Sequence, residues 1–312
     1  MRNQLGALAP VRAATGTVCA LLATVVSIPA AHAEWIPTNF GIGADAEVRE
    51  SNPTQNRGAS TEIATRVRND FIAGDPSDGT DRNSAIYTKF DLSGVSQAGP
   101  YTTAFRMTYR NNNLSGPRIQ DTITPNPAIR TGLAIYGLNP AANGANWSED
   151  TITYLNAPGM TFDGDVGTTD FNSDLTFLGT VSFPEIGNQN NLPVGQQLVF
   201  TSALLDQFVN DAIDGGAMHV TLVSARIHGG DSPFSNWVNF NYLFNPKEQT
   251  TLNNDPNYDF DITDPNNPLG SPYSGADNST GQFSPSLLIV PEPATGVMTL
   301  LALTALVSRR RR

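Results

Sequence analysis

The sequence predicts an all-β fold of sandwich or barrel type, because short segments of alternating apolar and polar residues are separated by frequent turn formers. Glycine, proline, asparagine, aspartate, serine and threonine are abundant, which is typical of many short strands joined by turns. The alternating segments lie at 63–68, 86–91, 105–110, 133–136, 181–183, 198–200, 218–223 and 286–290. Alternation at period two predicts that one face of each strand packs on a core and the other faces solvent.

One segment departs from this pattern and predicts a single helix. From Ser202 to Ile213, apolar residues stand at positions 204, 205, 208, 209, 212 and 213, the stripe expected on one face of a helix. Thr201 or Ser202 can cap its start, and Gly215-Gly216 can end it. We expect this helix to close one end of a β-sandwich.

The N-terminal segment has the features of a secretory signal peptide. Arg2 and Arg12 supply positive charge, an apolar run follows at 18–28, and Ala31-His32-Ala33 is a small-residue cleavage site. The pattern predicts cleavage between Ala33 and Glu34. A retained membrane anchor is the alternative, but the apolar run is shorter than the ~20 residues that span a bilayer.

The C-terminal residues form a second transport signal in three parts. A polar triplet comes first, then 14 apolar or small residues at 294–307, then a terminal run of arginines. The triplet is Pro291, Glu292 and Pro293, and the run is Arg309, Arg310, Arg311 and Arg312. A basic cluster after an apolar stretch stops transfer across a membrane and stays on the cytoplasmic side.

This tail resembles the PEP-CTERM sorting signal of Gram-negative bacteria, which has the same three parts in the same order. The resemblance implies that an exosortase recognises the triplet and processes the tail. It also implies that a hydrophobic helix anchors the protein in the inner membrane before sorting to the envelope or the exterior, in a bacterium that makes exopolysaccharide. An ordinary single-span anchor is the alternative, although 14 residues is short against the usual ~17–25.

Removal of residues 1–33 and of the tail, 291–312, leaves a mature domain at 34–290. Its 12 Lys and Arg stand against 28 Asp and Glu, a net charge of −16. So acidic a chain is not expected to bind nucleic acid, whose phosphates require a basic patch. The only cysteine, Cys19, leaves with the signal peptide, which excludes disulfides, thiol nucleophiles and thiolate metal sites from the mature domain.

Several blocks of the mature domain carry a second resemblance. Three early blocks lie at 44–60, 82–93 and 105–109, and the second of them ends in Phe-Asp-Leu-Ser. The most specific block, 146–158, reads Asn-Trp-Ser-Glu-Asp-Thr-Ile-Thr-Tyr-Leu-Asn-Ala-Pro. Together they resemble the DNRLRE-domain family, which implies a jelly-roll β-sandwich like those of carbohydrate-binding modules. The family's late Ser-Arg-Glu block is echoed faintly by Asn245-Pro-Lys-Glu248.

Two tryptophans are candidate sugar-binding residues, since an aromatic ring can stack on the apolar face of a pyranose. Trp237 shares one face of a predicted strand with Asn239 and Asn241, whose amides can hydrogen-bond sugar hydroxyls. Trp147 is either a second platform or a structural corner, and its place in a fixed motif favours the corner. Tyr154 belongs to the same motif and is expected in the core.

The longest predicted loop, 245–283, contains a candidate calcium site. Its acidic residues are Asp255, Asp259, Asp261 and Asp264. Calcium takes six to eight oxygen ligands, and carboxylates of one flexible loop can supply several. The spacing is not that of an EF-hand, and a solvated acidic loop without metal is the alternative.

These features favour an exported, non-catalytic protein of the cell surface or extracellular matrix that associates with exopolysaccharide. The chain lacks the G-x-S-x-G, H-E-x-x-H and phosphate-loop motifs, and His219 and His228 are the only histidines left for acid–base work. A polysaccharide lyase or hydrolase that uses carboxylates is one alternative. A self-associating structural protein of the envelope is another.

Overall fold

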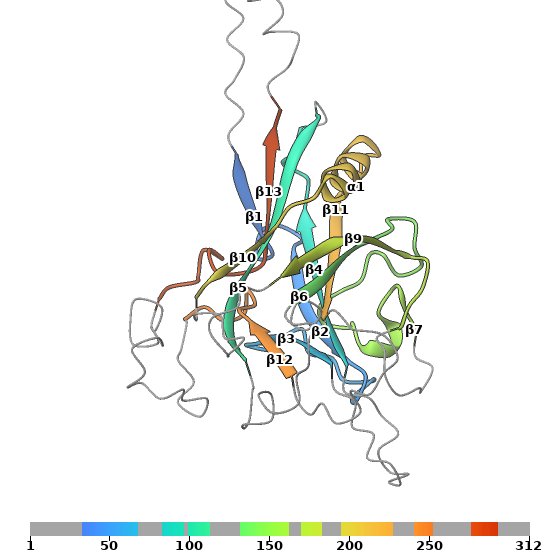
Figure 1. Cartoon of the computed structure of the whole chain (residues 1–312), viewed down its shortest axis with the longest axis vertical. Coiled ribbons are helices and arrows are strands. Elements are labelled where there is room, and N and C mark those ends of the chain that lie inside the picture. Colours follow the sequence, from blue (N-terminus) through green and yellow to red (C-terminus); the bar gives the residue numbers. More distant parts are fainter. Residues whose placement is uncertain are drawn as a thin grey trace, which may run out of the picture. The chain divides into compact units, whose positions relative to one another are not determined.

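A computed structural model describes residues 33–67, 83–96, 99–112, 132–161, 170–182, 195–226, 240–251 and 276–292. These residues are mostly β-strand with one α-helix, which confirms the predicted all-β class in a sandwich-like form (Figure 1). No helix within these ranges is long and apolar enough to cross a membrane. The predicted signal peptide, apart from Ala33, and the tail from Pro293 onward lie outside them.

Most of the strands are short, as the turn-rich sequence predicted. In the described ranges they are β1 (Glu34–Pro37), β2 (Ala44–Arg49), β3 (Ile63–Val67), β4 (Ser84–Asp91), β5 (Tyr101–Asn112), β6 (Gly132–Leu138), β7 (Met160–Thr161), β8 (Asp170–Phe171), β9 (Leu175–Ser182), β10 (Gln197–Phe200), β11 (His219–Arg226), β12 (Phe240–Phe244) and β13 (Ser286–Pro291). The helical elements are the 3-10 turn η3 (Tyr154–Asn156) and the helix α1 (Ala203–Asp214).

Eleven of these strands form one hydrogen-bonded sheet that folds over itself, and β5 belongs to both halves. The first part of β5 pairs with β13 and β10, whereas its last residues pair with β12. From β12 the sheet continues through β3, β4, β11 and β6 to β9, and β2 also pairs with β4. A strand that passes from one layer to the other lets the two halves face each other across a shared core.

The main core lies between these two halves. Its largest fully buried side chains include aromatic residues from the three strands β4, β5 and β12, namely Phe90, Phe105, Tyr109, Tyr242 and Phe244. The rings meet edge to face, with centroids 5.9 Å apart for Phe90 and Phe105 and 6.4 Å apart for Tyr109 and Tyr242. This is the geometry that aromatic pairs prefer.

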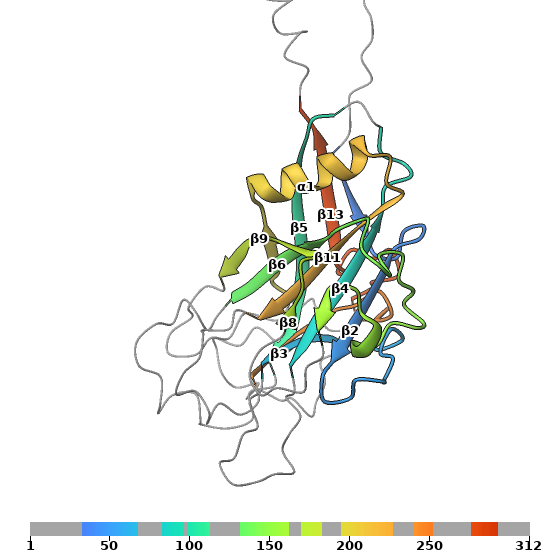
Figure 2. The ribbon, with the colours of Figure 1, turned by 90° about the vertical axis from the view of Figure 1, so that its right-hand side faces the viewer.

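Helix α1 forms where the sequence predicted it and packs on the main core. The hydroxyl of Ser202 accepts the backbone N–H of Leu205 at 2.9 Å, and Gly215 is the C-cap. Four of the six residues of the predicted apolar stripe are buried, namely Leu205, Val209, Ala212 and Ile213. Figure 2 shows the helix lying across the ends of several strands, which agrees with its predicted role of closing one end of the sandwich.

A second core covers the outer face of the layer that contains β2, β4, β11 and β6. Strand β4 is buried at all eight positions: Ile86 and Phe90 face the main core, whereas Tyr87 faces the second. The prediction that one face of each strand meets solvent is therefore wrong for β4. The cause is the segment 139–161, which packs Trp147 and Tyr154 over that face.

The two ends of the mature domain are neighbours in the sheet. Strand β1 begins at Glu34, the predicted first residue after cleavage, and pairs antiparallel with β13, Glu34 lying opposite Ile289. At the other side of β13, Pro291 lies opposite Tyr101, and the N–H of Glu292 donates to Pro100 O at 3.0 Å. The first two residues of the predicted sorting triplet are thus paired with the residues at the start of β5.

Burial of β4 on both faces predicts that Tyr87 contributes strongly to stability. Its hydroxyl donates to Pro158 O at 2.7 Å and its side chain has no exposed surface. Tyr87→Ala should lower the free energy of unfolding, measured by urea denaturation, by about 3–5 kcal/mol. Phe40→Ala is the matched control, since Phe40 is 51% exposed, and its effect should stay below about 1 kcal/mol. Equal, small effects would contradict two-sided burial.

Candidate functional site

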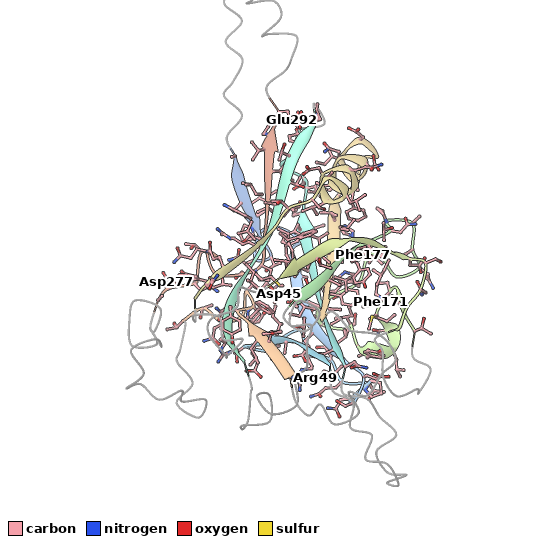
Figure 3. The ribbon with its side chains drawn as sticks, viewed as in Figure 1. Asp45, Arg49, Phe171, Phe177, Asp277 and Glu292 are labelled. Atoms are coloured by element: carbon pink, nitrogen blue, oxygen red, sulfur yellow. The ribbon has the colours of Figure 1, made fainter. Side chains whose placement is uncertain are left out.

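Three carboxylates from distant parts of the sequence meet at one place in the domain. Asp45 lies in β2, Glu149 in the segment that covers the second core, and Glu248 in the turn after β12. One carboxylate oxygen from each residue lies within 4.8 Å of the others. Asp45, labelled in Figure 3, has no exposed surface, and the other two are partly buried. These three residues are called the acidic cluster below.

Strand β2 brings Asp45 into the cluster because its two faces differ. Its apolar residues pack in the second core, so that Asp45 and Glu47 point to the opposite face, where both are fully buried. Glu47 forms ion pairs with Arg49 and, at 3.4 Å, with Arg57. The charge of Glu47 is therefore balanced locally, which makes the environment of Asp45 the unusual one.

Glu149 reaches the cluster because Trp147 fixes the segment that carries it. The indole Nε1–H donates to Thr221 Oγ1 at 3.1 Å, and the ring meets Tyr87 edge to face at 5.9 Å. Two residues further on, Oε1 of Glu149 accepts the backbone N–H of Asp45 at 3.3 Å. The covering segment is thereby joined to β2 as well as to β11.

Glu248 is positioned by hydrogen bonds to and from the backbone of the turn that follows β12. The N–H of Asn245 donates to Thr108 O at 3.1 Å, which continues the pairing with β5. The side-chain amide of Asn278 donates to Gln249 O at 2.9 Å. These bonds hold the turn against the rest of the domain and direct Glu248 toward the other two carboxylates.

Hydrogen bonds satisfy only part of the acidic cluster. Oδ2 of Asp45 accepts from the hydroxyl of Thr38 and, at 3.1 Å, from the N–H of Lys247. Oδ1 of Asp45 is buried and has no hydrogen-bond partner among the described residues, and the same holds for Oε2 of Glu248. Buried polar atoms are nearly always paired in folded proteins, so two such oxygens in one cluster require an explanation.

Among the described residues, two ammonium groups lie near the cluster, and only that of Lys247 contacts the carboxylates. Nζ of Lys247 is 2.5 Å from Oε2 of Glu149 and 3.8 Å from Oε1 of Glu248. The ammonium of Lys89 instead donates to the carbonyl of Trp147 and lies 4.7 Å from the centroid of its ring. Within the described residues, the ammonium of Lys247 is therefore the one cation in direct contact with this cluster of three carboxylates.

The pKa values reflect this excess of negative charge. Burial raises the pKa of Asp45, and the charge of Glu149 adds to the effect. Burial also raises the pKa of Glu248, together with the charges of Asp45 and Glu149. Burial acts to lower the pKa of Lys247, but the hydrogen bond and charge of Glu149 outweigh it and raise the pKa. The cluster favours bound positive charge, whether a proton or a cation.

Trp147 is a core residue rather than a stacking platform. Its side chain is 6% exposed, with Tyr87 at its edge and the ammonium of Lys89 over its ring. The sugar-binding role considered for it is therefore corrected in favour of the structural-corner alternative. Tyr154, predicted to be core, is 1% exposed.

Most other predicted site residues lie outside the described ranges. They are Trp237, Asn239, Asp255, Asp259, Asp261, Asp264, Pro293, Arg309, Arg310, Arg311 and Arg312. Asn241 stands in β12 opposite Arg66 of β3. Strand β12 thus begins at Phe240, within the predicted strand, and the sugar-binding, calcium and sorting roles of these residues stay predictions.

A partly exposed aromatic group lies where β6 pairs with the edge strand β9. Tyr136 and Phe177 are direct cross-strand partners with ring centroids 5.5 Å apart, and the ring of Phe171 lies 4.5 Å from that of Tyr136. Phe177 is 49% exposed, whereas Tyr136 and Phe171 are partly buried against the second core. Phe171 and Phe177 are labelled in Figure 3.

The sequence did not predict the acidic cluster or this aromatic group. A signal for the cluster was nevertheless present: Asp45, Glu149 and Glu248 belong to three separate blocks of the family resemblance, at 44–60, 146–158 and 245–248. Nothing in the sequence alone says that those blocks meet. A scan against protein-family models finds no match to this chain, and a search of curated proteins finds none either.

The close fit around Glu149 predicts that Gly58 tolerates no side chain. A Cβ at Gly58 would lie 2.2 Å from the carbonyl oxygen of Glu149 and 2.5 Å from its Cγ. Gly58→Ala should therefore lower the free energy of unfolding in urea by about 1–3 kcal/mol. Gly94→Ala is the control, because a Cβ there meets nothing within 4 Å and should change stability by less than about 0.5 kcal/mol. If the two variants were equally stable, Glu149 would not be held against Gly58.

Proposed function

We propose that this chain is an exported, non-catalytic protein of the cell surface or extracellular matrix whose jelly-roll domain associates with exopolysaccharide. The secretory features of residues 1–33 and the resemblance of the tail to a PEP-CTERM signal support export and sorting. The resemblance of the mature domain to the DNRLRE family supports a carbohydrate ligand. The all-β, sandwich-like fold of the described residues supports the proposal at the level of fold class.

The observation that carries the binding proposal is the exposed aromatic group of Tyr136, Phe171 and Phe177. A ring with about half of its surface in water gains free energy when an apolar surface covers it. The C–H face of a pyranose ring is such a surface, and a neutral sugar brings no charge that the acidic domain would repel. Phe177 supplies the exposed face, the ring of Tyr136 contacts Phe177, and the ring of Phe171 contacts Tyr136 in turn.

The arrangement of the strands supports display of the domain from its tail. The end of β13, at Pro291, lies opposite Tyr101 at the start of β5, whereas β12 pairs with the last residue of β5, Asn112. At ~3.3 Å per residue, the 12 residues of β5 separate these points by roughly 36 Å. A tether after Pro291 would therefore leave the β12 end of the domain far from the membrane.

The acidic cluster does not favour the hydrolase alternative. Carboxylates that hydrolyse a glycosidic bond must both reach the substrate, one as acid and the other as base or nucleophile. Asp45 has no exposed surface and its neighbours are partly buried. The cluster is therefore better suited to holding the fold together than to contacting a polysaccharide.

The proposed surface predicts that Phe177→Ala weakens polysaccharide binding by about 10-fold, since it removes most of one stacking contact. Binding of the full-length chain to purified host exopolysaccharide and to a glycan array is the measurement. Leu204→Ala is the matched control, because Leu204 is also 49% exposed but lies on α1, and it should bind as the unaltered chain does.

Other outcomes of the same experiment separate the alternatives. Loss of binding in Trp237→Ala but not in Phe177→Ala would move the site to the segment before β12. Release of shorter products from the polysaccharide would identify a lyase or hydrolase. Absence of binding to every glycan, with concentration-dependent assembly, would replace the proposal by a self-associating structural protein.

A further inference from the structure

The two unpaired carboxylate oxygens of the acidic cluster are the starting point of a further inference. Oδ1 of Asp45 belongs to a residue with no exposed surface, and neither it nor Oε2 of Glu248 has a hydrogen-bond partner among the described residues. A buried carboxylate without partners is unfavourable unless it is neutralised or coordinates a metal. The cluster also contains Glu149, whose carboxylate lies within reach of both.

We propose that Asp45, Glu149 and Glu248 together bind one divalent cation, and that calcium is the ion that fits. The three carboxylates converge within 4.8 Å, so that an ion between them can contact an oxygen of each. The proposal is separate from the candidate loop at 255–264 and does not depend on polysaccharide binding.

The donor atoms select calcium among the common divalent ions. Carboxylates are the only side-chain ligands in the cluster, and zinc prefers nitrogen and sulfur ligands. Three carboxylates that bind through one or two oxygens each supply three to six of the six to eight ligands that calcium takes. The carbonyl of Gly43, 3.4 Å from Nζ of Lys247, is a further oxygen at the site. Magnesium demands regular octahedral geometry and keeps several waters, which a buried cluster accommodates poorly.

The ammonium of Lys247 marks the position of the cation. It contacts Glu149 and Gly43 and lies 3.8 Å from Glu248, so it fills the place that an ion would take. A single charge leaves the cluster negative, whereas a divalent ion neutralises more of it. The lysine side chain is 19% exposed and long enough to move toward solvent. Calcium and the ammonium are therefore expected to compete for one position.

An ion at this position would have a structural role, because its ligands come from three separate parts of the fold. Asp45 lies in β2, Glu149 in the segment over the second core, and Glu248 in the turn after β12. The raised pKa values of Asp45 and Glu248, caused first by burial, are consistent with a cluster that lacks a counter-charge. Bound calcium would crosslink the covering segment to the sheet.

Thermal unfolding of the full-length chain tests the proposal. After removal of metal by chelator, calcium at 100-fold excess over its dissociation constant should raise the melting temperature by about 5–10 °C. Titration calorimetry should show one ion per chain. Sodium chloride at matched ionic strength is the control for screening of the acidic domain, and magnesium should bind at least 10-fold more weakly.

Three variants locate the site. Glu149→Gln and Glu248→Gln should each weaken calcium binding by at least 10-fold, since each removes one charged ligand. Glu248→Gln should leave the metal-free chain as stable as before or more stable, because it removes one repelling charge, whereas Glu149→Gln also removes the ion pair with Lys247 and should lower the stability of the metal-free chain. Lys247→Met should tighten calcium binding because it removes the competing ammonium. If a glutamine variant fails to fold, as judged by circular dichroism, the Lys247→Met result still decides, and unchanged or weaker calcium binding there overturns the proposal.

A second comparison separates the acidic cluster from the predicted loop site. Replacing Asp255, Asp259, Asp261 and Asp264 together by Asn should leave the calcium-induced shift in melting temperature intact. Loss of the shift in that variant, with the shift retained in Glu149→Gln and Glu248→Gln, would overturn the proposal in favour of the loop. Absence of any calcium-induced shift in the unaltered chain would overturn it outright.

Discussion

The fold depends on covering the outer face of the layer that contains β4. Tyr87, Val223 and Ala225 on that face are as buried as the residues of the main core, so the segment 139–161 is an integral layer and not a surface loop. Trp147 secures it through a hydrogen bond to Thr221 and a ring contact with Tyr87. Burial of apolar surface drives the packing of this segment on the sheet. The contacts of Trp147 then fix where the segment lies on it.

The charged interior follows from this cover. Strand β2 gives its apolar side to the second core and its acidic side to the opposite face, where the turn after β12 closes over Asp45. There Glu47 forms ion pairs with Arg49 and Arg57. Asp45, Glu149 and Glu248, in contrast, share the single lysine Lys247. The cost of burying a charge depends on how completely it is paired, so the negative charge of the acidic cluster is less completely compensated than that of Glu47.

The sequence pattern predicted those elements of the fold that depend on interactions between residues close in the chain. The capped helix at 203–214 and the alternating strands are encoded by residues close in sequence, and Ser202 and Gly215 act as expected. Two-sided burial of β4 was not predictable, because Tyr87 and Lys89 are amphipathic and occupy either environment. The acidic cluster was missed for a related reason: 104 residues separate Asp45 from Glu149, and only the packing of the cover brings them together.

Pairing of β1 with β13 connects the fold to the two predicted transport signals. Glu34 begins the strand that the predicted cleavage would leave at the N-terminus, and its partner strand ends at Pro291, the first residue of the predicted sorting triplet. Glu292 is still bound to the domain, through its N–H to Pro100 and its carboxylate, which accepts from the hydroxyl of Thr102 at 3.3 Å. An enzyme that recognises the triplet in extended form must either engage it at the sheet edge or first separate these two residues from β5. Completion of the sheet and exposure of the predicted sorting triplet are thus opposed at the same two residues.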